Sequence, residues 1–248
     1  MTEPIIEFKN VKKSFDDNVI LEDLSFKVYP GETFCIVGGS GTGKSVSLKL
    51  LLGLLPIDSG EIFYQGRLIS DLSENELNQM RHEFGMVFQG SALFDSLTIH
   101  DNVAYPLKEF TDADEEEIDT KVKEMLHVVG LPGVEDLYPA DLSGGMRKRI
   151  GLARALVGHP KVILYDEPTA GLDPANVNRI DQLIMHLQKK YQVTSILVTH
   201  NMTSVFTVAD RITLLYDKHA AFQGSLHDFK SSTNSLVSGF IKGEVGDE

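Results

Sequence analysis

The sequence is short of cysteine and of basic residues, and each shortage excludes a class of protein. Cys35 is the single cysteine of 248 residues, so neither an internal disulfide nor a cysteine-rich metal site can form. Because Cys35 lies in the apolar run TFCIV, we expect it to be a small buried side chain. The net charge of −13 argues against a nucleic-acid partner, since non-specific binding requires lysine and arginine to neutralise phosphates. A local basic patch is still compatible with this charge.

Long apolar runs are also missing. No run approaches the roughly 18 to 20 residues that a helix needs to cross a bilayer. The N-terminus, MTEPIIEFKN, has an acid and a proline where a secretory signal has a basic stretch, so we expect no such signal. We therefore expect a cytoplasmic chain, unless a membrane partner holds it at the surface.

What the sequence does contain is the pattern of an α/β domain, with 42% hydrophobic and 24% charged residues. Apolar residues two apart over residues 5–28 predict antiparallel strands, and the run at 33–37 predicts a buried strand. Helical spacing follows at 45–55, so strand, glycine-rich loop and helix form a βα unit. Two more buried strands are predicted at 162–166 and 195–200. A helix is expected between them, around residues 177–188.

The middle of the chain, residues 89–159, is interpreted as a helical subdomain inserted between the first and second core strands. One helix is indicated by the spacing of Ile118, Val122, Met125, Leu126 and Val129, and another by Met146, Ile150, Ala153 and Val157. Residues 1–88 and 160–224 form the other lobe, which ends in a predicted hairpin at 211–224. The tail, residues 225–248, carries little that demands a fold of its own.

A glycine-rich motif lies between the first buried strand and its helix. GGSGTGKS matches the pattern G-x-x-x-x-G-K-[ST], in which backbone N–H groups at a helix N-terminus cradle phosphates. Lys44 is expected to reach the β- and γ-phosphates, and Ser45 to hold Mg²⁺. A flexible glycine turn is the alternative, but the flanking strand and helix are those that phosphate binding requires. The predicted nucleotide-binding residues here are Gly38, Gly39, Ser40, Gly41, Thr42, Gly43, Lys44, Ser45 and Val46.

This motif specifies the fold class. We predict an α/β P-loop NTPase (RecA-like) core, with an N-terminal antiparallel β subdomain and the inserted α-helical subdomain, in a single domain of residues 1–248. In such open sheets, ligands bind beyond the carboxyl ends of the strands. The three predicted core strands end in GGSGTGKS, in DE and in TH, so these polar groups should line one crevice.

Two of those strand ends carry acid–base chemistry. Asp166 can accept Mg²⁺-bound waters, and Glu167 can polarise an attacking water. His200 can form a bond to the γ-phosphate. A DE pair on its own is more typical of a solvated loop. A single histidine on its own more often has a structural role. Their place beside a phosphate loop in one sheet favours a hydrolytic site.

A second helix opening also favours anions. LSGGM places Ser143, Gly144 and Gly145 at a helix N-terminus, where free N–H groups can bind a γ-phosphate. The first loop already cradles the phosphates of one nucleotide. A separate binder therefore suggests that two copies of the chain close on shared nucleotides, as a homodimer.

With these motifs the sequence resembles the nucleotide-binding subunit of ATP-binding-cassette (ABC) transporters, over essentially its whole length. In the family's order, the motifs are GGSGTGKS (Walker A), VFQG with Gln89 (Q-loop), LSGGM (signature), VILYDEP (Walker B), AGLD with Asp173 (D-loop) and His200 (switch). The resemblance implies ATP and Mg²⁺ as cofactors. It also implies ATP hydrolysis coupled to a membrane permease, with the chain bound peripherally at the cytoplasmic face of the inner membrane.

The same resemblance implies roles for single residues. Phe15 is similar to the aromatic that stacks on adenine, although a core phenylalanine is the alternative. Gln89 is similar to a Mg²⁺ ligand that also senses the membrane partner, and Glu167 to the catalytic base. The implied catalytic set is Glu167, His200, Lys44 and Gln89, the implied metal set is Ser45, Gln89 and Asp166, and Asp173 joins the nucleotide-binding set.

Two positions depart from the family's pattern. Met146 stands where the signature usually has glutamine, which leaves the Ser143 hydroxyl and the glycine amides. Val46 follows Ser45 in place of the common threonine, which leaves only a backbone N–H for the α-phosphate. Neither change removes a charge or the base, so we expect hydrolysis to survive both.

A narrower resemblance concerns the cargo. Residues 90–109, LSGGM and the tail SGFIKGEVGDE are similar to the ATPase of Mla-type phospholipid transporters, which work with MCE-domain proteins between inner and outer membranes. Residues 90–109 lie where the family's permease inserts its coupling helix; packing of the lobe is the alternative explanation of some of them. Other ABC systems stay open, namely amino-acid import, lipoprotein release and a non-transporting ATPase of the cell-division type. The acidic charge and the single cassette disfavour translation-factor or DNA-repair members.

Overall fold

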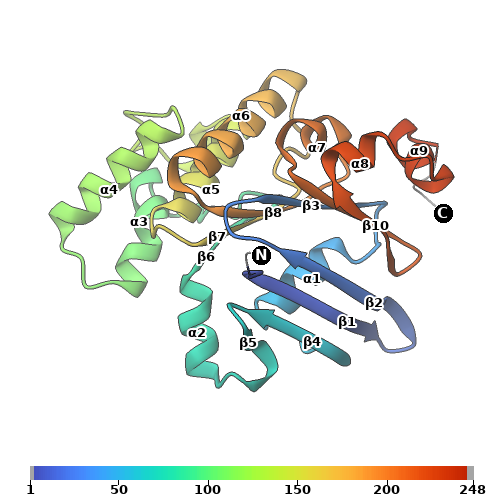
Figure 1. The fold of residues 1–248 in the computed structure, drawn as a ribbon. Helices are drawn as coiled ribbons and strands as arrows, with labels where there is room; N and C mark the ends of the chain where they lie inside the picture. The colour runs from blue at the N-terminus through green and yellow to red at the C-terminus, as the bar shows by residue number, and fades with distance from the viewer. Residues whose placement is uncertain (1–2, 245–248) are drawn as a thin grey trace.

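The computed structural model describes residues 3–244 and arranges them around a ten-stranded sheet (Figure 1). Across the sheet the strands are β5 (Arg67–Leu68), β4 (Ser59–Tyr64), β1 (Ile6–Phe15), β2 (Asn18–Val28), β10 (His219–Ser225), β9 (Arg211–Tyr216), β3 (Thr33–Gly38), β8 (Thr194–Val198), β7 (Val162–Asp166) and β6 (Phe84–Val87). The first four are antiparallel, and β9, β3, β8, β7 and β6 are parallel. The predicted α/β P-loop NTPase fold is confirmed.

Aromatic side chains join the two parts of the sheet. The rings of Phe8 on β1 and Phe26 on β2 stack with centroids 4.3 Å apart, and Phe26 stacks in turn on Phe34 of β3 at 5.1 Å. All three side chains are buried, as the alternation of apolar residues predicted for the N-terminal strands. The antiparallel strands are therefore packed directly against the strand that leads into the glycine-rich loop.

The parallel strands lie close to their predicted positions, with one difference at the site edge. β7 has the predicted bounds, whereas β8 ends at Val198 instead of His200. Thr199 leaves the strand because its hydroxyl accepts the Asn201 N–H at 3.0 Å and begins the turn into the next helix. His200 therefore lies on a turn and not on the strand itself.

Helices follow the core strands, as a βα pattern requires. α1 (Lys44–Leu51), α6 (Pro174–Tyr191) and α7 (Met202–Val208) come after β3, β7 and β8. α1 is shorter than the predicted 45–55. Gly53, with φ of +62°, donates to Leu50 O and Leu54 donates to Lys49 O, the bonds of a Schellman motif that ends the helix.

The remaining helices before residue 160 are α2 (Glu74–His82), α3 (Ile99–Phe110), α4 (Glu115–Val128) and α5 (Gly144–Leu156), with short 3₁₀ turns at Ile69–Asp71 and Pro139–Asp141. α3, α4 and α5 gather beside the β6 edge of the sheet (Figure 1). Val103, Val122 and Ile150 are fully buried in their shared core. The boundaries of the helical subdomain at residues 89 and 159 stay a prediction.

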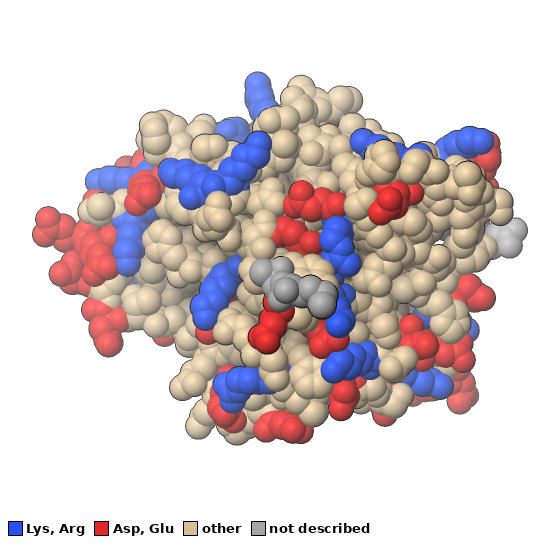
Figure 2. All heavy atoms as spheres, viewed as in Figure 1, with Lys and Arg blue, Asp and Glu red and all other residues tan. Residues whose placement is uncertain are grey.

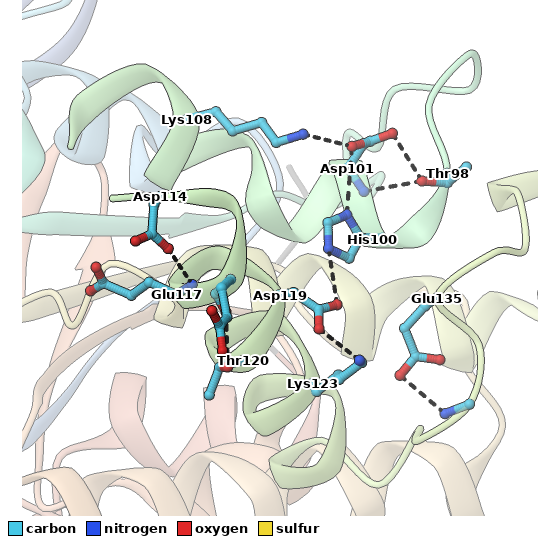
Figure 3. A network of polar contacts seen from close by, with 12 residues as sticks. Thr98, His100, Asp101, Lys108, Asp114, Glu117, Asp119, Thr120, Lys123 and Glu135 are labelled. Atoms are coloured by element: carbon cyan, nitrogen blue, oxygen red, sulfur yellow. Dashed lines mark hydrogen bonds and ion pairs between the residues drawn. The ribbon is translucent and has the colours of Figure 1, made fainter. Parts of the chain in front are cut away.

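A polar network crosses the surface between α3 and α4 (Figure 3). The ring of His100 lies between Asp101, at 3.6 Å from Nδ1, and Asp119, at 3.7 Å from Nε2. Lys108 pairs with Asp101 at 3.0 Å and Lys123 with Asp119 at 2.6 Å. Acidic side chains gather over α4 at one edge of the face in Figure 2. The acids in the first turn of α4, Glu115, Glu116 and Glu117, are stabilised by the positive end of the helix dipole.

The C-terminal tail folds, which corrects the sequence-based expectation. α8 (Leu226–Lys230) and α9 (Ser235–Lys242) bury Phe229, Val237 and Phe240 in the same core as the parallel strands. The apolar spacing of α9 is too short to have stood out in the sequence. Residues 245–248, which carry part of the tail similarity, lie outside the described residues. Within residues 3–244, no helix combines the length and the apolar character needed to cross a membrane.

Candidate active site

The glycine-rich loop joins β3 to α1 and has the backbone shape of a phosphate cradle. Gly41 and Gly43 have φ of +76° and +95°, which side chains rarely adopt, and Gly43 is the N-cap of α1. A Cβ on Gly43 would lie 2.8 Å from Cδ2 of Leu21. Lys44 Nζ donates to the carbonyls of Gly38 and Gly39, at 3.0 and 2.6 Å. The loop, the lysine and the helix N-terminus therefore lie together as the motif requires.

The other residues of the loop are also placed. Ser40 and Gly41 are exposed, and Thr42 Oγ1 donates to Gly39 O at 3.0 Å. Val46 is half-buried and packs against the antiparallel side of the core. Its side chain is therefore engaged in packing, and its backbone N–H lies in the first turn of α1.

A hydroxyl and a carboxylate meet beside the loop. Ser45 Oγ donates to Asp166 Oδ1 at 2.6 Å, across 121 residues of sequence. Both groups offer oxygen, the ligand type that Mg²⁺ prefers, and Mg²⁺ is commonly held by one or two carboxylates together with substrate phosphates. No cluster of three metal-ligating acids, histidines or cysteines is present in the described residues. The residues present therefore fit a nucleotide-bound Mg²⁺.

Glu167 is held in place by three neighbours on the adjacent strand end. Its N–H donates to Val198 O at 2.9 Å, Thr199 Oγ1 donates to Oε2 at 3.1 Å, and Oε1 lies 2.8 Å from His200 Nδ1. Its φ of +48° costs about 1 to 2 kcal/mol for a residue with a side chain, so these contacts hold a strained conformation. Glu167 is only 9% exposed. The sequence placed Thr199 at the crevice, in the strand end TH, but gave it no role of its own.

Gln89 lies beside these groups through the pairing of β6 with β7. Val87 pairs with Tyr165, so Gln89 and Glu167 are each two residues beyond the last matched pair. The Gln89 carbonyl accepts a hydrogen bond from Lys148 Nζ, which also lies 3.5 Å from Glu167 O. The structure thus brings the Q-loop backbone next to the Walker B glutamate. Magnesium binding by the exposed Gln89 side chain stays a prediction.

The signature segment forms a second cluster with the D-loop. Ser143 caps α5 by accepting the Met146 N–H at 3.3 Å, and a Cβ on Gly145 would lie 2.7 Å from Asn176 Oδ1. Asn176 Nδ2 donates to Asp173 Oδ2 at 2.5 Å. This bond and the backbone N–H groups of Asn176 and Ala175 lower the pKa of Asp173. Gly144 lies beside Leu172 of the same loop, so the two motifs form one surface.

Phe15 lies at the end of β1, by the β1–β2 turn, with 42% of its surface exposed. Lys13 Nζ lies 5.3 Å from its ring centroid. The ring is therefore no core side chain, which removes the alternative explanation. Stacking on adenine stays a prediction.

Two cations of α5 were not found from the sequence. Lys148 is 7% exposed and Arg154 is half-buried, and burial lowers the pKa of each. Arg154 donates to Ser91 O at 2.9 Å and Ala92 O at 2.7 Å. The spacing of apolar residues identified the apolar face of α5. It could not show that backbone carbonyls from residues 89–92 lie against another face of the same helix.

Comparison with known proteins identifies the class to which this site belongs. The family model for "ABC transporter" matches residues 21–170. A structure of the dimeric, post-hydrolysis ATP-binding cassette MJ0796 bound to ADP and Pi is 30% identical, with a TM-score of 0.82, over 89% of this chain and 98% of that one. The chain belongs to the ABC transporter family and is an ABC ATPase domain.

Relatives within the family differ in their named systems. The probable ribonucleotide transport ATP-binding protein mkl of Mycobacterium leprae is 44% identical over 96% of this chain and 69% of its own length. The methionine import ATP-binding protein MetN of Clostridium tetani is 40% identical over 90% and 70%. The intermembrane phospholipid transport system ATP-binding protein MlaF of Haemophilus influenzae is 38% identical over 98% and 92%. Similarity to these proteins fixes the family and leaves the cargo undecided.

Proposed function

We propose that this chain is the ATP-hydrolysing subunit of an ABC transporter and works as a pair of identical copies. The observation that carries the proposal is the Glu167–His200 contact beside the Ser45–Asp166 contact, at the mouth of the glycine-rich loop. In this arrangement Lys44 binds the β- and γ-phosphates, while Ser45, Asp166 and Gln89 hold Mg²⁺. When bound, Mg²⁺ neutralises charge on the phosphate oxygens.

Glu167 is proposed as the catalytic base, oriented by Thr199 and His200. A general base must lie within hydrogen-bond reach of the water it activates, and it contributes roughly 10²- to 10⁴-fold. Glu167→Gln is expected to bind ATP and to lose turnover, with the exposed Glu61→Gln as a matched control that keeps activity. Near-normal hydrolysis by Glu167→Gln would remove this role.

The proposed dimer follows from the second cluster. The signature residues lie beside the D-loop, at Asp173, and their contacts are with that loop and not with the phosphate loop; they are Ser143, Gly144 and Gly145. In a dimer, these residues of the partner chain would face the γ-phosphate. The dimeric state of MJ0796 supports this proposal. Sedimentation of Glu167→Gln with ATP and Mg²⁺ should show a dimer that dissociates when nucleotide is removed. A monomer at saturating ATP would contradict it.

A membrane permease is the proposed partner, and a groove beside α3 offers a place for it. The groove has a volume of about 540 Å³ and exposes Phe88, Phe94, Tyr105 and Phe110. Exposed aromatic patches of this kind mark interaction sites. We propose that a cytoplasmic segment of the permease fills it, which places the chain peripherally at the cytoplasmic face of the inner membrane. Phe94→Asp should prevent co-purification with the permease and leave ATP binding intact.

For the cargo we propose phospholipid, moved between inner and outer membranes together with an MCE-domain protein. Support comes from the similarity to MlaF and from the run at residues 90–109. Amino-acid import is the second candidate, since MetN is similarly close. The two candidates are distinguished by identifying the small molecules that stay bound to the complex when it is extracted from native membranes. Phospholipid enriched relative to its content in the bulk membrane supports phospholipid transport, and retained methionine supports amino-acid import.

A further inference from the structure

One face of α5 lies along the backbone that follows the Q-loop. Lys148, Gly151 and Arg154 are spaced three apart, so each neighbours the next in one row along the helix surface. Lys148 donates to Gln89 O, and Arg154 donates to Ser91 O and Ala92 O at 2.9 and 2.7 Å. Gly151 lies against the same segment, since a Cβ there would be in van der Waals contact with Ser91 O at 3.4 Å.

The segment held in this way has an unusual backbone. Ser91 and Ala92 are consecutive and have φ of +62° and +47°, in the left-handed region that favours glycine. Ser91 is 3% exposed, so its carbonyl has little access to water. Such conformations persist only where surrounding contacts determine them. Arg154 supplies such contacts to both residues, and Lys148 holds the carbonyl of Gln89 just before them.

Both ends of this contact lie at places that matter for the proposed function. Arg154 lines the groove beside α3, with its guanidinium 5.8 Å from the ring centroid of Phe94. Lys148, six residues nearer the signature end of α5, also lies 3.5 Å from Glu167 O. The same helix begins at the signature segment. One rigid element therefore touches the groove, the Q-loop backbone and the Walker B turn.

We propose that Lys148 and Arg154 clamp residues 89–92 to α5, so that a displacement at the groove is passed to Gln89 and Glu167 as one movement. The proposal rests on the proposed function of this site. Lys148 and Arg154 are positioning residues, since they act on backbone carbonyls and not on nucleotide.

The test uses three variants of the full chain. Lys148→Met removes the ammonium group and keeps the length of the side chain, and Lys148→Arg restores a cation. Arg154→Lys keeps the charge but loses the fork that spans two carbonyls. Lys189→Met, an exposed position on α6, is the matched control. Hydrogen–deuterium exchange of residues 89–94 is measured for each, together with kcat and KM for ATP.

Lys148→Met is expected to exchange faster at residues 89–94 and to lose about tenfold in kcat, with KM for ATP changed less than about twofold. Lys148→Arg should recover most of both, and Arg154→Lys should give faster exchange at residues 91–94. Unchanged exchange in a folded Lys148→Met would overturn the clamp, and faster exchange with normal kcat would overturn its link to catalysis. A defect that Lys148→Arg leaves uncorrected would also count against it. Absence of hydrolysis by the parent chain would instead refute the proposed function, and the exchange comparison would still decide the clamp.

Discussion

Nδ1 of His200 lies 2.8 Å from Oε1 of Glu167, although 33 residues separate them in the sequence. The contact joins the turns that follow two neighbouring parallel strands, β7 and β8. With Thr199 on the other carboxylate oxygen, it fixes the direction in which Glu167 presents its charge. A carboxylate can accept about four hydrogen bonds, so one contact at each oxygen orients Glu167 and leaves acceptor sites for a further donor.

Replacement of His200 should therefore affect the chemistry and not the binding of nucleotide. His200→Ala is expected to lose about 100-fold in kcat, because Glu167 then keeps only Thr199 as a side-chain partner. ATP affinity, measured by equilibrium titration, should change little because Lys44 and the glycine loop are untouched. His219→Ala, an exposed histidine on β10, should behave as the parent chain. Equal losses in the two variants would argue against a special role for His200.

The Ser45–Asp166 contact makes a prediction about magnesium. Ser45→Ala removes the hydroxyl that donates to Asp166 and should raise the Mg²⁺ concentration for half-maximal hydrolysis by about tenfold. Ser45→Thr keeps the hydroxyl and should stay close to the parent. A Mg²⁺ titration at saturating ATP measures the shift. The metal role of Ser45 fails if both variants have the parent's Mg²⁺ requirement.

The sequence predicted best those elements whose pattern was long or whose chemistry was local. β7 has the predicted bounds because VILYD is a continuous apolar run that ends in acids. The glycine loop followed from its motif, and its flanking strand and helix were both found. By contrast, β6 is four residues long and α8 five, too short for any periodicity to identify them.

Part of the site depended on contacts between distant segments, which no local pattern encodes. Lys148 appeared in the sequence as one of several cations in MRKR, and nothing there distinguished the buried one from its neighbours. The buried Lys148 is the one that donates to the Gln89 carbonyl, and Gln89 follows β6, far from α5 in the sequence. The pairing of Asn176 with Asp173 beside Gly145 was hidden for the same reason.

The folded tail gives a prediction about stability. Phe229 is 0% exposed and its ring contacts that of Phe222 at 5.1 Å between centroids. Phe229→Ala should lower the free energy of unfolding by about 3 to 5 kcal/mol, since it leaves a cavity in the core. Tyr216→Ala, at an exposed position, should cost less than about 1 kcal/mol. Urea denaturation measures both, and similar small losses would show that the tail contributes little to the core.

Asp181 on α6 gives the stability of the fold a pH dependence. The residue is 1% exposed, and burial raises its pKa to about 6, against a hydrogen bond from Ser204 that lowers it. The folded state therefore keeps a proton on Asp181 at pH values where the unfolded chain, with a pKa of 3.8, has lost it. Since the folded state binds more protons in this range, the free energy of unfolding falls as the pH rises from about 4 to about 6, and this contribution is constant above that range.

Asp181→Asn has no proton to lose and should remove this slope. Near pH 4 the variant is expected to match the parent, because the amide resembles the protonated carboxyl in size and polarity. At about pH 8 it should be the more stable of the two, since the parent then carries a buried charge. Urea denaturation of both chains across this range is the measurement, with the exposed Asp95→Asn as control. A variant that is less stable than the parent at pH 8 would mean that the charged carboxylate is favoured at this position, opposite to the direction that burial imposes.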